Sequence, residues 1–129
     1  EMSLGDLLVA KQNKTLYTAT LGDSIRKVEG IMRQNAVSQM PVVDKEGLLV
    51  GLIEEVDMLK HMLEEHNHSN DEPIDPLVQK AGAVYTPSTS LDDAMHSLTE
   101  GLALIIVDGN RPAGILTKID VLDFVAGKI

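Results

Sequence analysis

An internal repeat is the sequence feature that most constrains the fold of this chain of 129 residues. A short strand pattern, an amphipathic helix pattern, an apolar run ending in Asp and a Gly-apolar-apolar-x-x-x-Asp motif occur in this order twice, roughly 65 residues apart. The paired segments are 17–20 and 83–86, the helical patterns from Ile25 and from Leu91, 40–44 and 104–108, and 51–57 and 114–120. Because a copy of ~60 residues buries little apolar surface by itself, we expect the two copies to share one core.

Each copy is predicted to fold as strand, helix, strand, strand and helix. The apolar runs 41–43 and 104–107 are too short for helices and indicate buried strands. The turn-rich segments 44–47 and 108–112 that follow them predict hairpins.

The repeat also predicts the domain organisation. The first repeat spans 4–65 and includes a short lead-in helix over 4–10, and the second spans 74–127 with a similar short helix over 76–80. The polar segment 66–73 is expected to be a solvated linker. The predicted fold class is α/β (α+β), with two tandem β-α-β-β-α repeats whose small sheets pack together in pseudo-two-fold symmetry.

Composition excludes several classes of function. With a net charge of −9, one Phe, two Tyr and no Trp, the chain lacks the positive charge and the aromatic side chains that nucleic-acid binding usually requires. The negative charge likewise disfavours binding to an anionic membrane surface. The absence of Cys excludes disulfides and thiol chemistry. No apolar run approaches ~20 residues, so we expect a soluble, cytoplasmic protein. Because the chain begins with Glu1, we expect it to be part of a longer protein.

Neither a catalytic nor a metal-binding motif is evident. The sequence contains no GxGxxG, P-loop, GxSxG or HExxH pattern, which argues against an enzyme. A metal site built from His61, His66 and His68 with nearby carboxylates is disfavoured, because the spacing fits no named zinc pattern and most of these residues fall in the predicted linker.

The order of motifs resembles the CBS domain, and two tandem copies resemble a Bateman module, over residues 4 to about 126. The segments 37–44 and 114–126 are also similar to the C-terminal regulatory region of cystathionine β-synthase, without its pyridoxal-phosphate domain. The resemblance implies a regulatory domain without a catalytic cofactor. It also implies an adenosyl effector (S-adenosylmethionine, AMP or ATP) and a homodimer. The module is expected to control an attached or partner enzyme, and cystathionine β-synthase is one candidate.

Thr117 and Asp120 carry the strongest local signal. Their spacing suits a helix N-cap, which opens very many helices. The same geometry presents free N–H groups to a phosphate and a carboxylate to ribose hydroxyls, so spacing alone leaves both interpretations open. The resemblance implies the second, with Thr at the phosphate, Asp at the ribose and strands of the other copy around the base.

Carried onto this sequence, the resemblance implies two clefts. The main cleft would be lined by Ile115, Thr117 and Asp120 of the second copy and by Leu16, Tyr17, Thr18, Val37, Ser38 and Gln39 of the first. The weaker cleft would use Leu52, Glu54, Asp57, Ala83, Val84, Ala103 and Leu104. Glu54 stands where the family has Thr or Ser, and a carboxylate repels phosphate. We therefore expect the weaker cleft to reject AMP and ATP and either to bind a ligand without phosphate or to stay empty.

A second hypothesis belongs to a different class of function. The chain could be a structural homodimerisation module with empty clefts, paired through the apolar faces of the helices predicted over 56–63 and 119–126.

Overall fold

A computed structural model describes residues 2–11, 15–64 and 70–127. The chain divides into two compact units. The first unit comprises the described residues of Tyr17–Lys80, and the second comprises those of Glu1–Leu16 and Ala81–Ile129.

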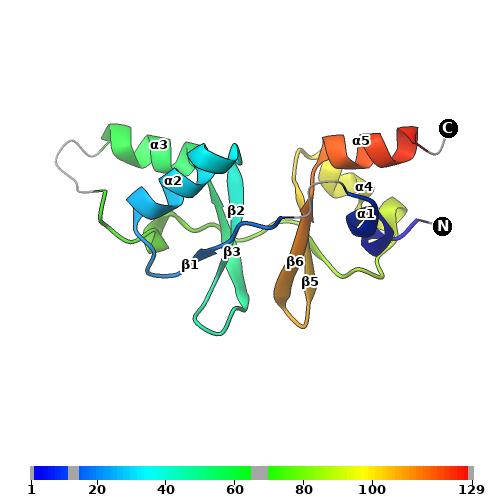
Figure 1. The fold of residues 1–129 in the computed structure, drawn as a ribbon, viewed down its shortest axis with the longest axis horizontal. Helices are drawn as coiled ribbons and strands as arrows, with labels where there is room; N and C mark the ends of the chain where they lie inside the picture. Colours follow the sequence, from blue (N-terminus) through cyan, green and yellow to red (C-terminus); the bar gives the residue numbers. More distant parts are fainter. Residues whose placement is uncertain (1, 12–14, 65–69, 128–129) are drawn as a thin grey trace. The chain divides into compact units, whose positions relative to one another are not determined.

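Both units contain the predicted order of elements (Figure 1). The first has β1 (Ala19–Thr20), α2 (Ile25–Asn35), β2 (Gln39–Val43), β3 (Leu49–Glu54) and α3 (Glu55–Glu64). The second has β4 (Val84–Tyr85), α4 (Leu91–Thr99), β5 (Leu104–Asp108), β6 (Arg111–Leu116) and α5 (Lys118–Ala126). Each sheet has three strands, the first parallel to the second and the second antiparallel to the third. The prediction of two α+β repeats is confirmed.

Local sequence signals explain the helix starts and the hairpins. The Ser24 and Ser90 hydroxyls cap α2 and α4, because each accepts the backbone N–H of the residue three positions later in the chain. The β5–β6 hairpin turns at Gly109 and Asn110, whose φ angles of 58° and 62° are those of a type I′ turn. In the β2–β3 hairpin the Asp44 carboxylate accepts the backbone N–H groups that close the longer turn.

Most of the buried hydrophobic residues that the structure describes fall in two hydrophobic clusters, one in each unit. The cluster of the first unit contains Ala19, Ile25, Val28, Met32, Met40, Val42, Ile53, Met58 and Ile74. The cluster of the second unit contains Leu4, Leu7, Ala83, Leu91, Ala94, Leu98, Leu104, Ile106, Leu116 and Val121. Leu4 and Leu7 belong to the lead-in segment of the first repeat and Ile74 to that of the second, so each cluster is completed by the lead-in segment of the other repeat.

The segments that lead into the copies are therefore exchanged. Helix α1 (Leu4–Ala10) lies beside α5 and β6 in the second unit (Figure 1), where the Leu4 N–H donates to the Thr89 carbonyl at 2.8 Å. The segment 70–80 packs in the first unit, where the Ile25 N–H donates to the Glu72 carbonyl at 2.9 Å. The repeat boundaries 4–65 and 74–127 thus do not coincide with the compact units.

The second lead-in segment differs from its prediction. The helix expected over 76–80 is a single 3-10 turn, η1 (Asp75–Leu77), because Gln79 instead pairs with Leu52 of β3 through two backbone hydrogen bonds of 2.8 Å. The predicted linker 66–73 lies outside the described residues over 66–69, while its end at 70–73 contacts α2.

The glycine of each repeat motif allows a lead-in segment to approach the sheet closely. A Cβ on Gly114 would lie 2.6 Å from Cδ2 of Leu8, and a Cβ on Gly51 would overlap the Gln79 carbonyl oxygen and lie 2.7 Å from Cγ1 of Val78. Each lead-in segment is thereby placed against β6 or β3, next to the helix that follows.

No helix in the described parts of the chain combines the length and the apolar character that a membrane span requires.

Candidate functional site

The start of α5 brings Thr117 and Asp120 together, as the sequence predicts. Thr117 is the N-cap, and its Oγ1 accepts the Asp120 N–H at 3.4 Å while its own N–H donates to Asp120 Oδ2 at 2.9 Å. The Thr117 hydroxyl also donates to Oδ2 at 3.0 Å. This reciprocal capping box fixes the carboxylate at the helix N-terminus, where the partial positive charge of the helix is greatest.

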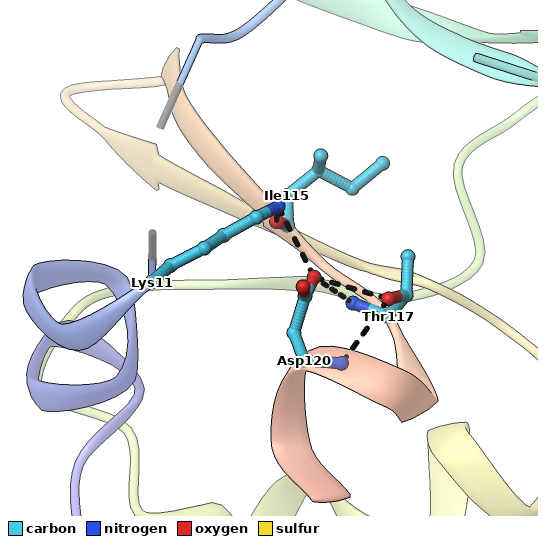
Figure 2. Close-up of polar contacts among 4 residues, drawn as sticks. All are labelled: Lys11, Ile115, Thr117 and Asp120. Carbon is cyan, nitrogen blue, oxygen red and sulfur yellow. Dashed lines mark hydrogen bonds and ion pairs between the residues drawn. The ribbon is translucent and has the colours of Figure 1, made fainter. Parts of the chain in front are cut away.

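Lys11 reaches this carboxylate from the end of α1 (Figure 2). Its Nζ lies 3.1 Å from Asp120 Oδ2 and donates to the Ile115 carbonyl oxygen at 2.7 Å. The side chains of Lys11 and Asp120 are 18% and 19% exposed, so the ion pair is largely shielded from water. Burial acts to raise the pKa of Asp120, but the Thr117 N–H, the Lys11 ammonium and the Thr117 hydroxyl together lower it below its ordinary value.

Two cavities of the second unit border on Lys11. One, of about 450 Å³, is lined by Leu7, Ala10, Lys11, Asp120, Asp123, Phe124 and Gly127. The other, of about 230 Å³, is lined by Leu8, Val9, Lys11, Thr15, Leu16, Ala113, Gly114 and Ile115. The volume of the first cavity lies within the range that is common for ligand pockets in proteins. Of the predicted main-cleft residues, this unit therefore places Leu16, Ile115, Thr117 and Asp120 around Lys11.

The equivalent position in the first unit has a different chemistry. Asp57 accepts the Glu54 N–H at 3.3 Å, so the backbone half of the capping arrangement is retained. Glu54 replaces the Thr hydroxyl, and the Gln79 side-chain amide donates to Glu54 Oε2 at 3.3 Å and to Asp57 Oδ2. Two carboxylates thus share a neutral amide where the second unit has one carboxylate and a lysine.

The remaining predicted residues are divided between the two units. Tyr17, Thr18, Val37, Ser38, Gln39 and Leu52 lie in the first unit, and Ala83, Val84, Ala103 and Leu104 lie in the second. Val37 and Ser38 line a hollow of about 710 Å³ with residues of α2 and α3. Ala83 and Leu104 are buried in the hydrophobic cluster of this unit. The clefts that residues of both units are expected to line together stay a prediction.

Sequence reasoning missed Lys11 and Gln79. Both belong to lead-in segments that pack against the unit containing the other copy, and such an exchange leaves no local signature in the sequence.

The described residues contain no group of three or more His, Asp or Glu side chains that could hold a metal ion. His61 Nε2 lies 3.1 Å from Glu72 Oε2, an arrangement that joins α3 to the segment after it. His66 and His68 lie outside the described residues.

The family model of the CBS domain matches residues 5–64 and 78–127, and the chain belongs to the CBS domain family. Two curated relatives are the inosine-5'-monophosphate dehydrogenase of Halalkalibacterium halodurans, 30% identical over 120 residues, and the uncharacterized protein MJ1404 of Methanocaldococcus jannaschii, 28% identical over 127 residues. These matches cover 91% and 88% of this chain but 24% and 30% of the relatives. The chain therefore spans less than a third of either relative.

Solved structures share the fold. A putative signal-transduction protein with CBS domains from Burkholderia ambifaria matches with a TM-score of 0.81 and 22% identity, over 98% of this chain and 95% of that one. The CBS domain pair of protein MJ0100, in complex with 5'-methylthioadenosine and S-adenosylmethionine, matches with a TM-score of 0.77 and 24% identity, over 99% of this chain and 98% of that one. CBSX2 in complex with AMP matches with a TM-score of 0.79 and 23% identity, over 98% of both chains. The predicted tandem CBS pair is confirmed.

Proposed function

We propose that the chain is a regulatory module that binds an adenosyl compound at the start of α5 and thereby controls an attached or partner enzyme. The Thr117–Asp120–Lys11 arrangement carries this proposal. It combines a fixed carboxylate for sugar hydroxyls with a helix N-terminus and an ammonium group for an anionic substituent, beside cavities whose walls are partly apolar.

The solved relatives support the class of ligand. The MJ0100 domain pair holds S-adenosylmethionine and 5'-methylthioadenosine, and CBSX2 holds AMP. Neither identity reaches 25%, so which adenosyl compound binds must be argued from the residues of this chain. The predicted contribution of the first copy, from Tyr17 to Gln39, is part of the proposal.

Regulation would operate by linkage. A ligand that binds one conformation of the module more tightly shifts the population toward it, and an enzyme domain that senses this conformation responds. The enzyme could be one joined to the module in a longer chain, cystathionine β-synthase among the candidates.

Calorimetric titration of the full chain with AMP, ATP and S-adenosylmethionine tests the proposal. We expect saturable binding of at least one compound, and Asp120→Asn should weaken it. Asp108→Asn, in the exposed β5–β6 hairpin, is the matched control and should leave the affinity unchanged. Absence of binding heat with all three compounds at more than one temperature would contradict the proposal.

A structural homodimerisation module is the second candidate. Its specific support is the set of exposed apolar side chains on α3 and α5: Val56, Leu59 and Leu63 are 44%, 55% and 68% exposed, and Ile119 and Leu122 are 58% and 60% exposed. Sedimentation velocity of the wild type and of a Leu59→Glu/Leu122→Glu variant distinguishes this role. A dimer that Glu substitution dissociates, in a chain that binds no adenosyl compound, would favour it over ligand sensing.

A further inference from the structure

We propose that Lys11 determines the ligand specificity of the half-site at α5, which consists of Lys11, Thr117 and Asp120. Lys11 would select adenosyl ligands that carry a phosphate. This inference rests on the proposed function and adds the chemical class of the ligand. In the structure Lys11 is the counter-ion of Asp120; with a phosphate bound, it becomes the counter-ion of the phosphate.

The hydrogen bonding of Asp120 supports such an exchange. One oxygen, Oδ2, receives three donors: the Thr117 N–H, the Thr117 hydroxyl and Lys11 Nζ. A carboxylate oxygen offers about two lone-pair sites, so one of the three donors can leave without exposing an unsatisfied acceptor. Oδ2 therefore has one donor more than its lone pairs require.

Lys11 is the donor best able to leave. The Thr117 N–H is fixed by the backbone at the start of α5, and the Thr117 hydroxyl is held within the same capping box. Lys11 belongs to another segment and carries its ammonium on a flexible four-carbon stem. Nζ has three N–H donors, and the Ile115 carbonyl at 2.7 Å keeps it in the site while another donor turns to a ligand.

The charges around the larger cavity make Lys11 decisive for an anion. Two carboxylates, those of Asp120 and Asp123, line this cavity of about 450 Å³, and among the described residues that line it Lys11 supplies the positive charge. A phosphate entering without Lys11 would meet two like charges, whereas with Lys11 it gains a charge-assisted hydrogen bond. The sulfonium group of a ligand gains nothing from Lys11, because both groups are cations.

The first unit provides an internal comparison. There the neutral amide of Gln79 contacts Asp57, and Glu54 adds a second carboxylate. An amide has no charge to pass to a phosphate, so the exchange proposed for Lys11 has no counterpart at this position.

The test compares AMP with adenosine, which lacks the phosphate, by calorimetric titration of the full chain. Lys11→Met, which keeps the length of the side chain without its charge, should weaken AMP binding by at least about tenfold and change adenosine binding by less than about threefold. Lys11→Arg should retain the preference for AMP. The control Lys45→Met, on the exposed β2–β3 hairpin, should change neither affinity.

The outcomes separate this inference from the proposed function. If the wild type binds S-adenosylmethionine but neither AMP nor adenosine, the proposed function stands and this inference fails; if it binds none of the adenosyl compounds, both fail. If both bind and Lys11→Met weakens them equally, or weakens neither, Lys11 is not the specificity residue although the site stands. Salt dependence of the wild type gives a reading that needs no variant: added NaCl should weaken AMP binding more than adenosine binding, and equal effects would overturn the inference.

Discussion

Replacing Gly51 with Ala tests whether the lead-in segment 74–80 is an essential part of the first unit. Gly51 lies on β3, where the segment carrying Gln79 runs against the sheet. A Cβ at this position would overlap the Gln79 carbonyl oxygen and lie 2.7 Å from Cγ1 of Val78, so the segment must move away.

The magnitude follows from what such a movement breaks. Leu52 and Gln79 exchange two backbone hydrogen bonds of 2.8 Å, each contributing about 1 kcal/mol to stability, and overpacking of the neighbouring chains adds about 1–3 kcal/mol. Gly51→Ala should therefore lower the free energy of unfolding by roughly 3–5 kcal/mol. This loss is a large fraction of the stability of an ordinary domain.

Urea unfolding followed by far-ultraviolet circular dichroism is the suitable assay, because the chain has no Trp. Gly114→Ala should cost about 1–2 kcal/mol, since its Cβ meets only the end of the flexible Leu8 side chain. Gly30→Ala, inside α2 with no atom within 4 Å of its Cβ, should raise stability by about 0.5–1 kcal/mol. An unfolding midpoint for Gly51→Ala equal to that of the wild type would refute the reasoning.

Three further predictions concern the polar residues. Asp120→Asn should weaken AMP binding by about 1–3 kcal/mol and Asp57→Asn by less, as measured by calorimetry; equal losses would contradict the difference between the two motifs. The lowered pKa of Asp120 stabilises the fold above the ordinary pKa of Asp, and this contribution disappears as the pH falls through the folded-state value. The stability difference between wild type and Asp120→Asn should thus be largest at neutral pH and vanish in acid, and a difference independent of pH would argue against it. Tyr85→Phe, which removes the 2.7 Å bond to the buried Ser97 hydroxyl, should cost about 1–3 kcal/mol, part of which Ser97→Ala restores in the double variant; fully additive losses in thermal unfolding would exclude this pairing.

The features that depend on local chemistry were predictable from the sequence. The order of elements follows from the repeat, and the β5–β6 turn follows from Gly109-Asn110, whose residue types tolerate positive φ. Thr117 and Asp120 form the capping box that their spacing predicts. These signals lie within a few residues of one another, so the sequence displays them directly.

The features that depend on long-range packing were not predictable in the same way. The chain around Lys11 gives no sign that its ammonium pairs with Asp120, because α1 packs in the unit of the second copy. The apolar residues near Gln79 suggested a helix, but backbone pairing with Leu52 holds this segment extended. Both interactions depend on an exchange of lead-in segments that a repeat alignment cannot reveal.

Titration of AMP into the isotope-labelled chain tests the central claim most directly. The claim is that the half-site at α5 binds an adenosyl ligand, whereas its counterpart at α3 does not bind one that carries a phosphate. Amide chemical shifts then report on each motif separately. We predict saturable shifts at Thr117 and Asp120, with smaller or no shifts at Glu54 and Asp57. Shifts of equal size at both motifs, or at neither, would contradict the claim.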